Sequence, residues 1–88
     1  MPLTETVEFL ARLQKWNRVQ IPVEVRWRYK LKAGELLKVR VHPVGSFGDE
    51  EFIAKLLCGG RFTIPWEAVW ALKLDKPGYM LRVRLIPH

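Results

Sequence analysis

The stretch Arg18-Val19-Gln20-Ile21-Pro22 returns 43 positions later as Arg61-Phe62-Thr63-Ile64-Pro65. The same offset relates further residues on both sides of the motif, and a one-residue insertion then changes it to 44. A repeat of this period means that one structural unit occurs twice in the chain. We therefore divide the sequence into two copies, about 5–43 and 52–88, which the linker 44–51 joins.

The segments that follow the two motifs differ in their pattern. Residues 23–31 alternate between apolar and charged, which taken alone predicts a strand. Their counterpart 66–74 does not alternate, and its Trp66 and Trp70 stand one helical turn apart. Because repeated segments should share a conformation, we predict a short helix in both copies.

Strand periodicity is clear elsewhere. Apolar and polar residues alternate in the segments 8–14, 37–42 and 81–86, as expected for strands with one buried face. With a short strand at each Ile-Pro motif, the predicted order of elements in both copies is strand–strand–helix–strand. Six strands can close a small barrel without long open edges. The predicted fold is mainly β: one domain over residues 1–88, a six-stranded pseudo-two-fold barrel built from two ββαβ repeats.

The composition favours a basic cytoplasmic protein. Fifteen Lys and Arg against nine Asp and Glu give a net charge of +6 and a pI near 9.9, which attracts polyanions. The lone Cys58 excludes an internal disulfide framework, and no apolar run approaches the ~20 residues of a membrane span. The charged fraction of 27% with few side-chain amides points toward a thermophilic source.

Two groups of cations are candidates for contact with nucleic acid, because neutralising phosphates is the main source of such affinity. One group flanks the two predicted hairpin turns and comprises Arg12, Lys15, Arg18, Lys55 and Arg61. The other stands at period two on the outward face of corresponding strands and comprises Lys38, Arg40, Arg82 and Arg84. The alternative for the second group is an ordinary solvated barrel exterior.

Three tryptophans invite different interpretations. Trp16 lies in the first predicted turn among cations, where an exposed indole can stack on a base; Gly59 stands opposite it in the repeat. The alternative is that Trp16 folds back onto the barrel. Trp27 and Trp70 recur at one position of both helices, and we predict that they belong to the core.

No arrangement typical of an enzyme is present. His42 and His88 lack neighbouring carboxylates or thiols at useful spacings, and Ser46, the only serine, lies in a glycine-rich linker. The segment 45–48 is too short for a phosphate-binding loop. We predict a non-enzymatic protein without cofactor or metal.

The motif Arg18–Pro22, followed by Val-Glu-Val-Arg and then by Gly34 before an apolar strand, resembles the SpoVT/AbrB superfamily. Arg61–Pro65 with Gly78 resembles it too. Members of that family pair two chains in a swapped-hairpin barrel and bind DNA through basic residues of the first hairpin. With both units in one chain, the sequence is similar to the cradle-loop barrels, particularly the archaeal RIFT type. The double-psi barrel, which connects the same elements differently, stays open.

The resemblance implies a small DNA-binding protein, an AbrB-like transcription regulator whose hairpin cations meet DNA. Two departures stand against the antitoxin branch: Tyr79 replaces the acidic residue that Glu35 supplies in copy one, and an acidic partner-binding tail is missing. With both units joined, we expect a monomer with an internal two-fold. The alternatives are a barrel that binds a protein or small ligand, and a minimal nucleotide-binding enzyme like the CTP-dependent riboflavin kinases.

Overall fold

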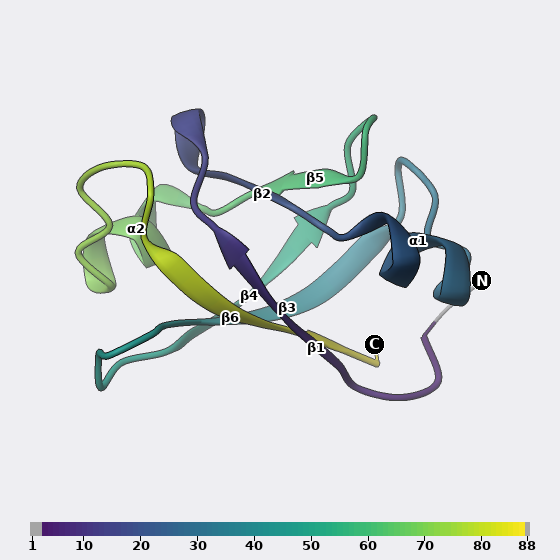
Figure 1. Ribbon diagram of the computed structural model, residues 1–88, viewed down its shortest axis with the longest axis horizontal. Coiled ribbons are helices and arrows are strands. Elements are labelled where there is room, and N and C mark those ends of the chain that lie inside the picture. The colour runs from purple at the N-terminus through teal and green to yellow at the C-terminus, as the bar shows by residue number, and fades with distance from the viewer. Residues whose placement is uncertain (1–2, 88) are drawn as a thin grey trace.

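Six strands and two short α-helices follow one another in the same order in both halves of the chain (Figure 1). The computed structural model describes residues 3–87. The elements are β1 (Val7–Arg12), β2 (Arg18–Gln20), α1 (Val23–Tyr29), β3 (Leu36–Pro43), β4 (Glu50–Lys55), β5 (Arg61–Thr63), α2 (Trp66–Ala71) and β6 (Met80–Ile86). The predicted ββαβ order is therefore confirmed, including both helices. No helix in this part of the chain is long and apolar enough to cross a membrane.

The two halves exchange strands. β1 pairs with β6 and β4 pairs with β3, so the first strand of each half lies against the last strand of the other half. β3 and β6 pair at the centre, which gives a four-stranded sheet in the order β1-β6-β3-β4. β2 and β5 form a second, two-stranded sheet. All four pairings are antiparallel.

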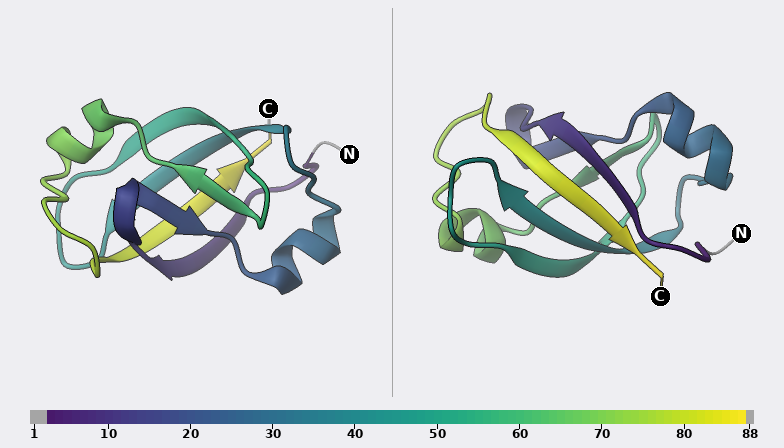
Figure 2. Two further views of the ribbon diagram at one scale, coloured as in Figure 1. Left: turned by 90° about the horizontal axis from the view of Figure 1, so that it is seen from above. Right: turned by 60° about the horizontal axis from the view of Figure 1, so that its bottom comes forward.

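Repeat counterparts face each other at the centre of both sheets. Arg40 lies opposite Arg84 in the β3–β6 pairing, and Val19 lies opposite Phe62 in the β2–β5 pairing. A ladder in which a residue meets its own counterpart has a two-fold axis through that pair. One pseudo-two-fold axis therefore passes through both sheets, and Figure 2 shows β2 and β5 crossing above the larger sheet.

The core lies between the two sheets. The alternating residues of β3 and β6 bury one face, as predicted: Leu37, Val39, Val41, Leu81, Val83 and Leu85. Val19 and Phe62 of the two-stranded sheet are 0% exposed and cover this apolar face from the other side. The period of two thus separates a buried face from an outer, polar face of the four-stranded sheet.

The strand ladders do not close into the barrel that we predicted. β2 and β5 are three residues long and pair with each other, and the bonds just beyond the ends of β1 and β4 continue the pairings of the larger sheet. The N–H of Leu13 donates to the carbonyl of Tyr79 and that of Leu56 donates to the carbonyl of Glu35, both at 2.8 Å. Between residues 3 and 87 the strands consequently form two facing sheets.

The prediction that Trp27 and Trp70 belong to the core is wrong. Their side chains are 76% and 78% exposed. The two helices have seven and six residues, so each turns only one narrow side toward the core. In α2 that side is occupied by Ala68, and no residue of α1 is fully buried. The repeated position faces outward in both helices.

Replacing Leu81 by Ala should lower the free energy of unfolding by about 2–5 kcal/mol, because its side chain is completely buried and its removal leaves a cavity. Leu10→Ala is the matched control, since Leu10 lies in the same sheet but on the exposed face. It should change the free energy by less than about 0.5 kcal/mol. Urea denaturation measures both variants, and equal losses would contradict the assignment of the two faces.

Candidate nucleic-acid interface

Two hairpin turns of the same construction stand on one side of the molecule. Residues 14–18 connect β1 to β2, and residues 57–61 connect β4 to β5. In each turn the N–H of the first residue donates to the carbonyl of the last, at 2.8 Å and 2.7 Å respectively. Both turns rise on the side of the two-stranded sheet in Figure 1. The pseudo-two-fold axis therefore places two equivalent turns on a common surface.

Both turns require a left-handed backbone at the same two positions. Gly59 and Gly60 have φ angles of 82° and 76°, and their counterparts Trp16 and Asn17 have φ angles of 65° and 57°. Glycine adopts this conformation readily, whereas a residue with a Cβ loses about 1–2 kcal/mol in it. The first turn thus keeps a large indole at a position where the backbone favours glycine.

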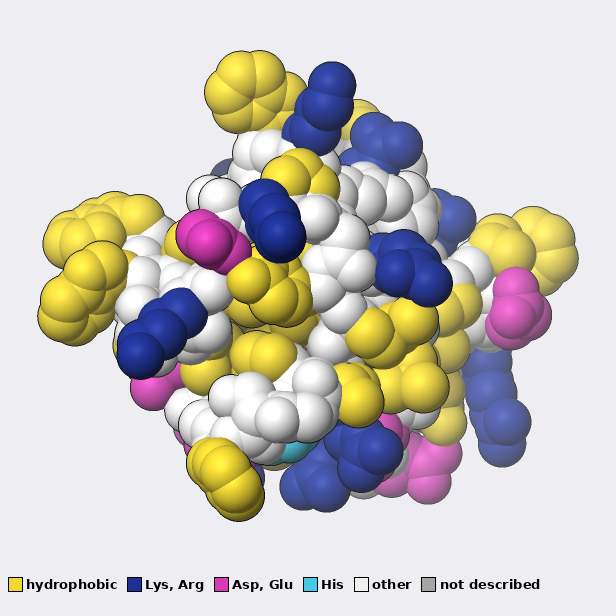
Figure 3. Space-filling view, turned by 60° about the vertical axis from the view of Figure 1, so that its left-hand side comes forward, with side chains coloured by type: hydrophobic (Ala, Val, Ile, Leu, Met, Phe, Trp, Pro, Cys, Tyr) yellow, Lys and Arg dark blue, Asp and Glu magenta, His cyan; other side chains and the backbone are white. Residues whose placement is uncertain are grey.

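Burial of the Trp16 side chain does not offset this conformational cost. Its side chain is 80% exposed, so it does not fold back onto the body of the protein. Backbone strain of this kind is found preferentially at functional sites. On this side of the molecule, hydrophobic side chains stand out from the surface close to Lys and Arg side chains (Figure 3). Trp16 is therefore available to a partner.

The structure divides the first group of predicted cations: Lys15, Arg18 and Arg61 lie at the turns, whereas Arg12 and Lys55 alternate onto the outer face of the four-stranded sheet. Arg12 and Lys55 end β1 and β4, Lys15 lies in the first turn, and Arg18 and Arg61 begin β2 and β5. All five side chains are exposed. Arg18 faces Thr63 and Arg61 faces Gln20 in the β2–β5 pairing, so both arginines project from the same outer face of this sheet.

Hydrogen bonds hold Arg61 in place without neutralising it. Its Nε donates to Oε1 of Gln20 at 2.9 Å, and the amide nitrogen of Gln20 donates to the carbonyl of Gly59. Between residues 3 and 87 no carboxylate forms an ion pair with Arg12, Arg18 or Arg61. The charge of these guanidinium groups is therefore available to an anion from solvent.

Arg26 of α1, which the sequence also suggests as an extension of the basic patch, lies in this region, and its repeat counterpart is the apolar Val69. Its side chain crosses the backbone of Gly60 so closely that any Cβ at position 60 would collide with the guanidinium group. The Nε of Arg26 is buried and has no hydrogen-bond partner. Glycine at position 60 thus accommodates both the positive φ and this close approach of the Arg26 side chain.

The second group of predicted cations lies on the opposite side of the molecule. It occupies the outer face of the four-stranded sheet and comprises Lys38, Arg40, Arg82 and Arg84. The core separates this face from the hairpin turns. The nine predicted residues therefore form two surfaces rather than one.

Two carboxylates contact three of the four cations in this second group. Arg40 lies 3.0 Å and Lys38 lies 3.4 Å from the carboxylate of Glu51, and Arg84 lies 3.6 Å from that of Glu8. Desolvation raises the pKa of Glu51, but the hydrogen bond from Arg40 and the charges of Arg40 and Lys38 outweigh it and lower the pKa overall. Because Lys38, Arg40 and Arg84 already contact carboxylates, the turns are favoured as the anion-binding surface.

Comparison with known proteins bears on the fold alone. No protein-family model matches the chain, and no curated protein matches it. The solution structure of PHS018 from Pyrococcus horikoshii is similar, with a TM-score of 0.79 at 23% sequence identity. The match covers 92% of this chain and 89% of that one. The two-sheet arrangement of exchanged strands described above thus has a counterpart in an archaeal protein.

Replacing Trp16 by Gly should leave the free energy of unfolding unchanged or raise it by up to about 1 kcal/mol, because glycine relieves the left-handed strain. The reciprocal variant Gly59→Trp should lower it by about 1–2 kcal/mol. Urea denaturation followed by circular dichroism measures both. A loss of several kcal/mol in Trp16→Gly would mean that the indole stabilises the fold instead of serving a partner.

Proposed function

We propose that this protein binds DNA through its turn surface, defined as the two hairpin turns with the outer face of β2 and β5. The observation that carries the proposal is the position of Arg18 and Arg61. They are repeat counterparts, project from one sheet face and have no carboxylate partner among the described residues. Two symmetric guanidinium groups can each hold a backbone phosphate by paired hydrogen bonds.

Electrostatics supports the same surface. The chain carries a net charge of +6, and three of the four cations in the second group contact carboxylates. Lys15 lies at the tip of the turn surface next to Arg18, and Arg61 projects from the same sheet face as Arg18. A phosphate backbone that runs across the turns would meet these charges in succession, and each contact would release condensed counterions.

Trp16 supplies the second part of the proposed interaction. A base presents a π face to any aromatic ring that reaches it, and stacking is tolerant of sequence. Trp16 stands at the tip of the first turn between Lys15 and Arg18, so an indole would contact a base while the cations hold its phosphates. The second turn has glycine at the matching position and would contact the backbone only.

We further propose that the chain is a single-chain relative of the SpoVT/AbrB proteins, related to the RIFT-type cradle-loop barrels although its own ladders form two facing sheets, with a cytoplasmic role in transcription regulation. The exchange of strands between the two halves supports this relationship, because it is the intramolecular form of a swapped hairpin. The duplicated Arg-x-x-Ile-Pro motif supports it independently.

Fluorescence anisotropy of labelled duplex DNA at several salt concentrations tests the turn surface. The double variant Arg18→Ala, Arg61→Ala should weaken binding and reduce the slope of log affinity against log salt by about 2, since each lost phosphate contact removes about 0.9. The control is Arg40→Ala, Arg84→Ala, which removes the same charge at another pair of repeat counterparts. It should leave the slope nearly unchanged. Equal effects of both pairs, or no binding at low salt, would overturn the proposal.

Stacking by Trp16 is tested separately with single-stranded DNA. Trp16→Gly should lose about 1–3 kcal/mol of binding free energy if one base stacks on the indole. Trp27→Ala is the control, because Trp27 is equally exposed but lies on α1, outside the turn surface. An unchanged affinity of Trp16→Gly would restrict the interaction to the cations.

A further inference from the structure

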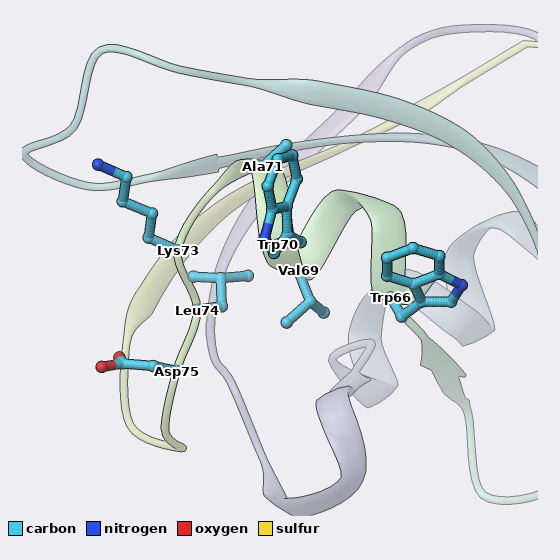
Figure 4. Close-up of a pocket in the computed structure, with 7 residues that line it drawn as sticks. All are labelled: Trp66, Val69, Trp70, Ala71, Lys73, Leu74 and Asp75. Atoms are coloured by element: carbon cyan, nitrogen blue, oxygen red, sulfur yellow. The ribbon is translucent and has the colours of Figure 1, made fainter.

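The outer side of α2 forms an apolar groove that the fold does not use. Trp66 is 72% and Trp70 is 78% exposed, and they stand one turn apart on the same helix. With Val69 and Leu74 they line a groove of about 600 Å³. Figure 4 shows both indoles projecting from α2 and Leu74 in the segment that follows. Exposed apolar patches of this kind in small proteins mark interaction sites.

The side chains that line this groove differ from their counterparts in the first half of the chain. The counterparts of Val69 and Ala71 on α1 are Arg26 and Arg28, which make the other end of the molecule cationic. The two halves therefore share a backbone but present different chemistry at their ends. A single self-complementary patch per chain leads to a closed pair, whereas two different mutually complementary patches would lead to a filament.

We propose that the α2 end is the interface with a second copy of this chain, related to the first by a two-fold axis. Charges at the groove support this occupant. Lys73 and Asp75 both line the groove and carry opposite signs. In a two-fold contact a residue i meets j while j meets i, so Lys73 of each copy can approach Asp75 of the other. The hydroxyl of Tyr79 donates to Asp75 at 2.6 Å and orients its carboxylate.

The apolar area also suits a second copy. The two indoles expose roughly 350 Å², and Phe47, which is fully exposed, adds roughly 200 Å². Phe47 lies in the β3–β4 loop at the same end of the molecule, where a Cβ on Gly48 would be 3.5 Å from Leu72. Complete burial of these side chains in two copies would remove at most roughly 1,100 Å², close to the ~1,000 Å² that a specific interface needs.

This proposal replaces the sequence-based prediction of a monomer. That prediction rested only on the pairing of the two halves within one chain. Strand exchange satisfies the β-sheet edges between those halves but leaves the outer side of α2 uncovered. The proposal is independent of DNA binding, because no residue of α2 belongs to the turn surface. A dimer of this kind would carry two turn surfaces.

Sedimentation equilibrium of the full chain, from about 1 µM to about 1 mM, tests the interface. The wild type should pass from monomer to dimer within this range. Trp66→Ala, Trp70→Ala should weaken the dimer at least about tenfold, since it removes most of the apolar contact. Trp27→Ala is the matched control, because Trp27 is the repeat counterpart of Trp70, and it should leave the dimer unchanged.

A charge exchange provides a second readout that does not depend on the indoles. Lys73→Asp alone should weaken the dimer, and adding Asp75→Lys should restore it at least in part, because the two charges then meet again with their signs exchanged. Circular dichroism checks that each variant is folded. A monomer at every concentration would overturn the proposal and leave another protein as the occupant of the groove. The proposal would also be overturned if Trp27→Ala disrupted the dimer, or if neither the double tryptophan variant nor Lys73→Asp weakened it.

Discussion

The antiparallel pairing of β3 with β6 is the interaction on which the rest of the structure depends. It joins the last strands of the two halves across the pseudo-two-fold axis, with Arg40 opposite Arg84. β1 and β4 then extend the sheet on its two sides, each against the strand of the other half. The two hairpins that begin with β1 and β4 consequently rise on one side of the sheet. The common surface of the two turns is a direct result of this exchange.

Within this symmetric framework the two halves have diverged where the backbone does not decide the side chain. Both turns need a left-handed conformation, yet one uses Gly59 and the other retains Trp16. Both short helices need one small or apolar side toward the core, yet Arg26 stands on α1 where Val69 stands on α2. Because the local fold is the same, these differences are the best guide to the separate roles of the turns and of the two ends.

The helices and strands were predictable from the sequence because the repeat presents each of them twice, with different side chains. Residues 23–31 alone would have been assigned to a strand, and only their counterpart revealed a helix. The prediction that Trp27 and Trp70 are core residues was wrong, because a repeat preserves the position of a side chain without showing whether that position is buried. The sequence pattern places cations on strands and at turns, but it does not show that the core separates these two groups. It also does not show that Glu51 and Glu8 neutralise part of the strand group.

By itself the sequence determined the duplication, the order of elements, the alternating core of β3 and β6 and the excess of positive charge. These are local or periodic properties, which the spacing of residue types along the chain records directly. Only the tertiary structure decided that the strands form two facing sheets, that Arg18 and Arg61 share one face and that the outer side of α2 is uncovered. Those outcomes depend on which surfaces meet in space, and contacts between distant segments leave no regular pattern in a single sequence.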